Sequence, residues 1–169
     1  FENSEDPSLV EETRRLREQA LFIDAGLEAK FRAALEEGSE AETEFLQAFS
    51  QLLAQPNVGS LTLDRSAQFI GVLQQTGQLE LARKACVMVQ QRYQDQANAD
   101  LKARAEQVMG MAIRRIELVG KPVAVAGVKL DGTPLDFSHY QGKTLLVTFF
   151  SAFDQRCQQE LNGIVEIYN

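Results

Sequence analysis

Residues 144–160 read TLLVTFFSAFDQRCQQE, and this stretch decides the fold expected for the last third of the chain. The apolar run Leu145–Phe150 is interrupted by Thr148 alone, which is typical of a β-strand buried on both faces of a sheet. Asp154 follows soon after and belongs to the residue types preferred at a helix N-cap. The stretch therefore predicts a central strand that leads into a helix.

The residues before this strand also predict β-structure. Val123–Leu130 has the composition of a strand, and Asp131-Gly132 is a strong signal for a tight turn. Pro134–Phe137 is short and extended in character, so it supplies a second strand. The order predicted for residues 119–169 is a β-hairpin, a buried strand and a helix.

Residues 1–118 are predicted to be helical instead. Their apolar side chains recur at steps of three, four or seven residues, as on one face of an amphipathic helix. The capping boxes Ser8–Glu11 and Ser39–Glu42 predict where the first two helices begin. We expect helices over residues 9–37, 40–55, 65–75, 79–93 and 98–119, with Asp64 as the N-cap of the third.

The segment Gly77-Gln78-Leu79-Glu80-Leu81-Ala82 joins two of these helices. Its glycine permits a left-handed turn, and its alanine permits two helix axes to approach closely. The segment resembles one tetratricopeptide-type hairpin, although an ordinary αα-hairpin has the same features. We therefore predict an α+β chain with two domains. Residues 1–118 form an all-α bundle of helical hairpins, and residues 119–169 form the β-hairpin–strand–helix segment.

Composition excludes some functions. The chain has a formal net charge of −7, with −8 on residues 1–50 and +1 on residues 51–169. An acidic surface repels phosphates, so no nucleic-acid partner is expected. No apolar stretch approaches the roughly 20 residues of a membrane-spanning helix. The sequence starts at Phe1 rather than Met, as expected of a processed product, so a signal peptide or membrane tether could have preceded it.

Two cysteines and one histidine are too few for a metal site, and no cofactor is expected. Cys86 lies on the apolar stripe of its helix, which predicts a core thiol. His139 lies in the loop before the buried strand, and we interpret it as a solvated side chain rather than a general base. A disulfide between Cys86 and Cys157 stays open, because the sequence does not give the distance between them.

Turn residues mark the boundaries in the last third, at Gly120-Lys121-Pro122, Leu130-Asp131-Gly132 and Tyr140-Gln141-Gly142-Lys143. Together with Leu145–Phe150 and Ser151–Glu160, they resemble the first half of a thioredoxin-like domain of the TlpA/ResA type. This family of thiol–disulfide oxidoreductases is related to the AhpC/TSA peroxiredoxins. The resemblance implies a truncated thioredoxin-like fold, exchange of disulfides, and a location in the periplasm or cell envelope.

The CxxC motif of that family falls on Asp154-Gln155-Arg156-Cys157. Asp154 takes the place of the attacking cysteine, Cys157 that of the second cysteine, and Glu160 that of the family's acidic residue. Because a carboxylate cannot start the exchange, enzymatic activity stays open. We interpret Asp154 as a helix N-cap. Cys157 has two interpretations, a buried inert thiol or a lone thiol that forms a mixed disulfide with a partner.

Two functions from different classes follow. The first is a TlpA/ResA-type protein with a degenerate active site, whose partner would be a protein thiol or disulfide. The second is a helical protein-interaction module with the thioredoxin-like part as scaffold. A peroxiredoxin-like activity ranks last, because its attacking thiol would also stand at Asp154. The family's later strands do not follow within residues 1–169. We therefore expect a fragment of a longer protein. If the chain is stable as given, we expect either the helical region or a swapped homodimer to cover the open strand edge.

Overall fold

The computed structural model describes residues 6–36, 38–56, 58–122, 127–148, 151, 153–157, 159–160 and 163. These residues contain six α-helices and one short 3-10 helix, η1. The elements are α1 Pro7–Asp24, α2 Leu27–Glu36, α3 Ser39–Leu53, α4 Ser60–Gln75, α5 Leu79–Gln94, α6 Ala99–Leu118 and η1 Phe137–Tyr140. Contacts divide the chain into two units, Phe1–Pro122 and Val123–Asn169. The first unit, called the helical unit below, holds all six α-helices. The domains predicted at 1–118 and 119–169 stay a prediction.

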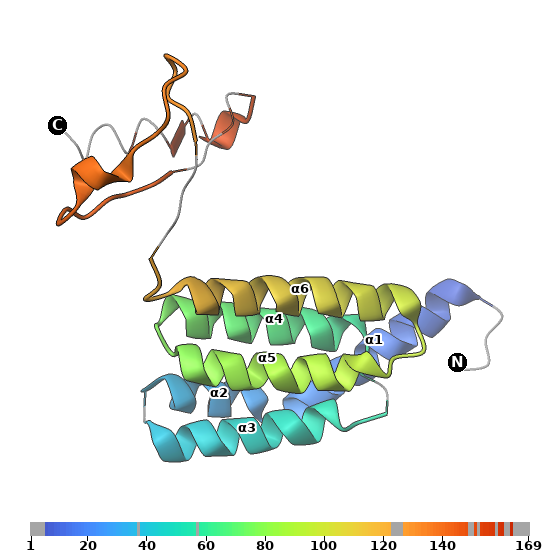
Figure 1. Ribbon diagram of the computed structural model, residues 1–169. Helices are drawn as coiled ribbons and strands as arrows, with labels where there is room; N and C mark the ends of the chain where they lie inside the picture. The colour runs from blue at the N-terminus through green and yellow to red at the C-terminus, as the bar shows by residue number, and fades with distance from the viewer. Residues whose placement is uncertain are drawn as a thin grey trace. The chain divides into compact units, whose positions relative to one another are not determined.

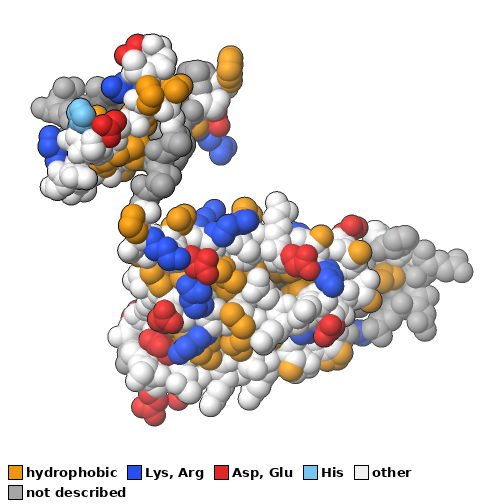
Figure 2. Space-filling model, in the orientation of Figure 1, with side chains coloured by type: hydrophobic (Ala, Val, Ile, Leu, Met, Phe, Trp, Pro, Cys, Tyr) orange, Lys and Arg blue, Asp and Glu red, His pale blue; other side chains and the backbone are white. Residues whose placement is uncertain are grey.

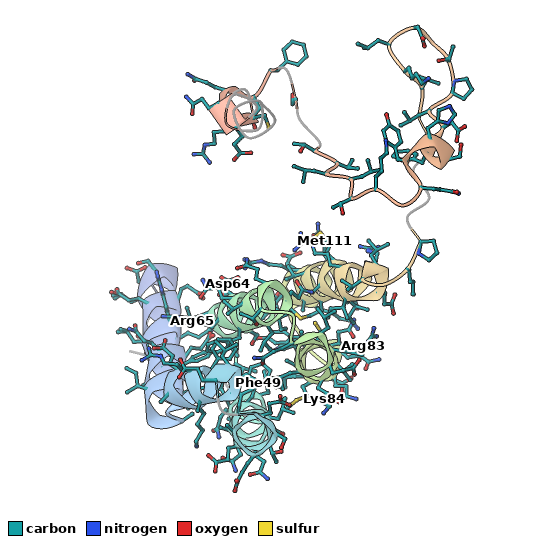
Figure 3. The ribbon with its side chains drawn as sticks, turned by 90° about the vertical axis from the view of Figure 1, so that its left-hand side faces the viewer. Phe49, Asp64, Arg65, Arg83, Lys84 and Met111 are labelled. Atoms are coloured by element: carbon teal, nitrogen blue, oxygen red, sulfur yellow. The ribbon has the colours of Figure 1, made fainter. Side chains whose placement is uncertain are left out.

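Neighbouring helices of the helical unit pack against one another. Pairs that are adjacent in the sequence lie side by side, as α2 does with α3, α4 with α5, and α5 with α6 (Figure 1). The last four helices run nearly along one direction, whereas α1 crosses them steeply and contacts α2 and α4 (Figures 1 and 3). The helical bundle predicted for this part of the chain is confirmed.

A cluster of phenylalanines from four helices forms the centre of this bundle. The Phe45 ring on α3 is fully buried and lies 5.3 Å from the ring of Phe31, 5.6 Å from Phe49 and 6.0 Å from Phe69, measured between centroids. Phe22 of α1 reaches the same cluster through Phe69 at 6.5 Å. Aromatic pairs at such distances add roughly 0.5–1.5 kcal/mol each beyond the area that they bury.

The single helix predicted over residues 9–37 is wrong, because the chain breaks between α1 and α2. Gly26 has a φ of +55°, in the left-handed region that favours glycine, and its N–H donates to the carbonyl of Ile23 at 3.1 Å. In a straight helix, Phe22 and Phe31 would be separated by about 14 Å along the axis. The break brings both rings onto Phe69, at 6.5 Å and 4.5 Å.

The predicted starts of α1 and α3 are also wrong. Asp6 rather than Ser8 caps α1, since its Oδ1 accepts a hydrogen bond from the N–H of Ser8 at 2.9 Å. The capping box predicted from Ser8 therefore does not form. Helix α3 has no side-chain cap hydrogen bond at its start, Gly38. Helix α6 begins as predicted, because Asn98 accepts from the N–H of Leu101 at 3.0 Å.

The α+β class is wrong for the part of the chain that the structure describes. No strand forms within residues 127–148, where the β-contact is an isolated antiparallel bridge between Val128 and Pro134. A turn forms at Asp131-Gly132, and the N–H of Lys129 donates to the carbonyl of Thr133 at 2.8 Å. The N–H of Leu135 also donates to the carbonyl of Gly127 at 2.8 Å. Two short strands without a third strand or a helix to cover them are marginal in water.

The segment predicted as a central strand departs most from expectation. Residues 144–148 have no regular secondary structure, and residues 149–150 lie outside the described part. Leu145, Leu146 and Val147 are 43%, 80% and 48% exposed, so no sheet covers them. A buried strand takes its hydrogen bonds and its covering side chains from distant segments, which the local sequence does not supply. The thioredoxin-like β-hairpin–strand–helix segment is therefore a prediction that the structure contradicts.

Candidate functional site

Asp154 stands immediately before a helical turn at residues 155–157. Its Oδ1 accepts a hydrogen bond from the N–H of Arg156 at 2.8 Å and approaches the N–H of Cys157 at 3.4 Å. A carboxylate in this place satisfies N–H groups that the first turn of a helix leaves unpaired. Asp154 thus acts as the N-cap of the turn, and its side chain is exposed to solvent.

Cys157 lies in this first turn as a free thiol, and its side chain is partly exposed. Residues 159–160 are helical as well, and Glu160 is exposed. Phe153, just before the cap, is fully exposed. The three positions that the family resemblance implies are therefore the cap of one helical turn, a residue in that turn, and one of the helical residues 159–160. The sheet that surrounds such a segment in thioredoxin-like proteins is not formed by the described residues.

Cys86 differs from Cys157 in its surroundings. It lies on α5, is fully buried in the core, and is also a free thiol. Burial raises the pKa of the Cys86 thiol to about 11, although the nearby Arg83 opposes the shift. The disulfide left open by the sequence is not formed, because both thiols are free. Cys86 has the environment of an inert core thiol.

His139 lies in η1 and is exposed. Its Nδ1 stands 3.2 Å from the hydroxyl of Ser138 and 3.5 Å from Oδ2 of Asp136. Hydrogen bonds from the N–H and hydroxyl of Ser138 lower the pKa of the Asp136 carboxyl, with a smaller contribution from His139. These contacts lie within four consecutive residues and describe a capped surface turn.

The sequence analysis missed a buried carboxylate in the helical unit. Glu18 of α1 is 1% exposed, and its Oε2 accepts from the N–H of Thr62 at 2.7 Å and from the Thr62 hydroxyl at 3.0 Å. Thr62 belongs to the first turn of α4, so a side chain from one helix caps the start of another. The start of α4 at Ser60, ahead of the predicted residue 65, is explained by this contact. Its signal in the sequence is the position of Glu18 four residues before the buried Phe22, on the same helix face.

Gly59 and Tyr93 complete this buried cluster. A Cβ atom at Gly59 would overlap Oε1 of Glu18, so the close approach of the carboxylate requires glycine there. The Tyr93 hydroxyl donates to the carbonyl of Gly59 at 2.6 Å. Burial first, and then the charge of Glu18, raise the pKa of Tyr93 above its usual value. The cluster joins α1, α4 and α5 and is structural, since its groups already satisfy one another.

A cavity of about 430 Å³ opens beside Gly59. Its walls come from α1, from the loop before α4 and from the loop before α6, and Figure 1 shows both loops at the same end of the bundle, next to α1. Arg14 and Arg17 supply the charged part of the wall, and Val10, Val58 and Leu101 supply apolar parts. None of the described residues that line it is acidic.

Ion pairs on the surface connect helices rather than build a site. Asp64 of α4 pairs with Arg104 of α6 at 2.6 Å, and Arg65 pairs with Glu28 of α2 at 3.2 Å. Figure 3 shows that the Asp64 and Arg65 side chains both come from α4. These pairs are about half exposed, so each contributes no more than about 1 kcal/mol. Positive and negative side chains are interspersed on the face of the helical unit seen in Figure 2.

The described residues contain no group of three or more His, Cys, Asp and Glu side chains that could hold a metal ion. Within the same residues, no helix has both the length and the apolar character needed to cross a membrane. Comparison with known proteins found no family model, no curated protein and no solved structure that matches this chain. The function is therefore argued from the residues themselves.

Proposed function

We propose that this chain is related to thiol–disulfide oxidoreductases of the TlpA/ResA type and works through one thiol, with Asp154-Gln155-Arg156-Cys157 in place of CxxC. The observation that carries this proposal is the position of Cys157. It is free, partly exposed, and lies in the first helical turn after its cap, Asp154. The sequence resemblance over residues 120–160 points to the same position. An extracytoplasmic location belongs to the proposal on the strength of the resemblance alone.

One thiol permits one exchange step. The thiolate of Cys157 attacks one sulfur of a disulfide in a partner protein, so a bond forms between the two sulfurs and the partner's disulfide breaks. The other partner sulfur leaves as a thiolate and takes up a proton. Because residue 154 is an aspartate, the motif has no second thiol to release the partner. The expected product is a lasting mixed disulfide, which an external thiol must resolve, rather than catalytic turnover.

The test is reaction of the full chain with a protein disulfide, such as insulin, followed by non-reducing mass analysis. The unmodified chain should form a covalent adduct through Cys157 and show no turnover. The variant Cys157→Ser should lose the adduct, whereas the control Cys86→Ser should keep it. Asp154→Cys restores the two-thiol spacing and should introduce insulin reduction. If Cys157 reacts neither with the disulfide nor with iodoacetamide at neutral pH, the proposal is wrong.

A second candidate, a helical protein-interaction module, is favoured by the outer face of α1. Leu9, Leu16 and Ile23 recur at every seventh residue of this helix and are 38%, 60% and 72% exposed. Residues seven apart lie on one face of a helix, so these side chains form an apolar stripe. Amphipathic helices bury such stripes against a partner surface, here either another protein or a second copy of the chain.

The two candidates predict different effects of substitution. Leu16→Asp should abolish capture of a partner, or self-association in light scattering, if the module is the working part. Leu118→Asp is a matched control, because Leu118 is also 60% exposed but lies on α6. Cys157→Ser should leave such binding unchanged. Binding that depends on Cys157 and disappears in a reducing buffer favours the thiol function instead.

A further inference from the structure

The cavity at the end of the bundle has the composition of a ligand site. Its volume of about 430 Å³ lies within the range of roughly 300–1,000 Å³ that small-molecule sites occupy. Polar and apolar side chains share its wall about equally, so it can contact both a charged and an apolar part of a ligand. The cavity belongs to the helical unit and does not involve Cys157, so it is independent of the function proposed above.

The charged side chains in the wall have one sign. Arg14 and Arg17 are three residues apart on α1 and therefore lie on the same side of that helix. Among the residues that the structure describes, the lining contains no Asp or Glu, in a chain with 24 acidic and 17 basic side chains. An aqueous cavity that concentrates positive charge in an acidic protein selects for anions.

Both arginines have other contacts, and that of Arg14 leaves donors for a ligand. Nη1 of Arg14 donates to Oε2 of Glu11 at 2.9 Å, and this pair is exposed on both sides. Arg17 also interacts with a neighbour. A guanidinium group has five N–H donors in a planar fork, so one acceptor leaves donors for a second, and the fork matches a carboxylate.

The loops opposite α1 add favourable backbone dipoles. Gly59 and Asn98 line the cavity and are the residues at which α4 and α6 begin. Helix N-termini attract anions. Some of the N–H groups at these helix starts are already bonded, since the Glu18 carboxylate accepts a hydrogen bond from the N–H of Thr62 and the Asn98 side chain accepts one from the N–H of Leu101. The helix starts therefore assist the arginines but do not replace them.

We propose that this cavity binds a carboxylate attached to a short apolar body, with Arg14 and Arg17 holding the carboxylate and Val10, Val58 and Leu101 contacting the apolar part. A peptide that ends in an apolar residue has this chemistry, and so does a free aliphatic acid. Both present one carboxylate next to a branched hydrocarbon group. The proposal names the shared chemistry, and the probes below distinguish the two sources.

The test is isothermal titration of the full chain with three probes. These are an acetylated dipeptide that ends in leucine with a free carboxylate, the same dipeptide as its amide, and isocaproate. The free dipeptide should bind at millimolar concentration or below, and the amide should bind at least about tenfold more weakly, because it lacks the charge that the arginines recognise. Binding of isocaproate as tight as that of the dipeptide identifies a free acid as the ligand type.

Matched variants assign the binding to the cavity. Arg14→Gln and Arg17→Gln should each weaken binding of the free dipeptide by about tenfold. Arg15→Gln is the control, since Arg15 lies between them in sequence but outside the cavity wall. Thermal melting of each variant checks that it is folded. The proposal is overturned if no probe binds, if the amide binds as well as the acid, or if Arg15→Gln weakens binding as much as the other two variants.

Discussion

The helical unit and the segment 127–148 carry similar apolar side chains but treat them differently. Phe45 and Leu63 in the helical unit are 0% exposed, whereas Leu130 and Leu146 in the second segment are fully or mostly exposed. A helix makes its hydrogen bonds within itself and needs other segments only to cover its apolar face. A strand needs other segments for its hydrogen bonds as well as for covering side chains. Similar hydrophobicity therefore produces a core in the helical unit, whose helices cover one another, but not in residues 127–148, where the described residues form no sheet.

The largest expected effect compares these two regions directly. Phe45→Ala should cost about 3–5 kcal/mol of unfolding free energy, because it removes a ring that contacts three other buried rings. Leu146→Ala should change it by no more than about 0.5 kcal/mol, since that side chain is 80% exposed. Urea denaturation followed by circular dichroism measures both values. A comparable loss from Leu146→Ala would show that residues 144–148 are buried in solution.

The next effect tests whether the helical unit depends on its buried carboxylate. Glu18→Ala should cost about 2–3 kcal/mol, because the Thr62 N–H and hydroxyl would lose their acceptor inside the protein. Glu12→Ala is the control on the same helix, where the side chain is exposed, and should change stability by about 0.5 kcal/mol at most. Equal values for the two variants would mean that Glu18 is solvated rather than a cap.

A smaller change in the unfolding free energy of the helical unit is expected at high pH. The folded state raises the pKa of Cys86 from 9.0 to about 11 and also raises that of Tyr93, so both groups stay neutral in the fold after they ionise in the unfolded chain. Their contribution to stability is complete below pH 9 and is lost as the pH rises toward 11 and above. The helical unit should therefore become easier to unfold in urea over this range.

Tyr93→Phe sharpens the same experiment. It should cost about 1 kcal/mol at neutral pH, because the hydrogen bond to the Gly59 carbonyl is lost. It should also make the decline at high pH shallower, because one of the two ionising groups is gone. An unchanged alkaline profile in this variant would contradict a buried, neutral Tyr93.

The smallest effect is local to the second segment. Asp154→Ala should destabilise the helical turn after it by about 1 kcal/mol, which corresponds to roughly fivefold faster amide exchange at Arg156 and Cys157. Global stability of the helical unit should stay unchanged. Asp154→Ser keeps a preferred N-cap residue and should preserve slow exchange, so equal exchange in both variants would argue against capping.

Much of the helical unit follows from its sequence because helix signals are local. Helix α5, Leu79–Gln94, ends one residue beyond its predicted range, and α6, Ala99–Leu118, lies within its predicted range of 98–119. The capping role of Asp154 can also be predicted from the local sequence, because its carboxylate accepts hydrogen bonds from N–H groups only two and three residues away. The break at Gly26 was missed because the apolar pattern continues through it. What breaks the helix is the gain from placing Phe22 and Phe31 on one distant ring, Phe69.

The candidate sites also differ in whether neighbouring or distant residues form them. The position of Cys157 after a capping Asp154 can be expected from the order of residues, because both belong to one turn. The exposure of residues 145–147 could not be predicted from the sequence. Their hydrophobicity shows that the segment prefers burial but not whether another segment covers it. The cavity at Arg14 and Arg17 also has no signature in the sequence, because its walls come from three segments that lie far apart in the chain.

By itself, the sequence determined most of the helices, their apolar faces and the N-cap at Asp154. Each of these depends on side chains and backbone groups within about one or two helical turns of one another. Tertiary structure alone decided that Glu18 would cap α4, that its carboxylate would lie against Gly59, and that residues 144–148 would lack a sheet. Those outcomes depend on which distant segments meet, and the energy of such contacts exists only once the chain has folded.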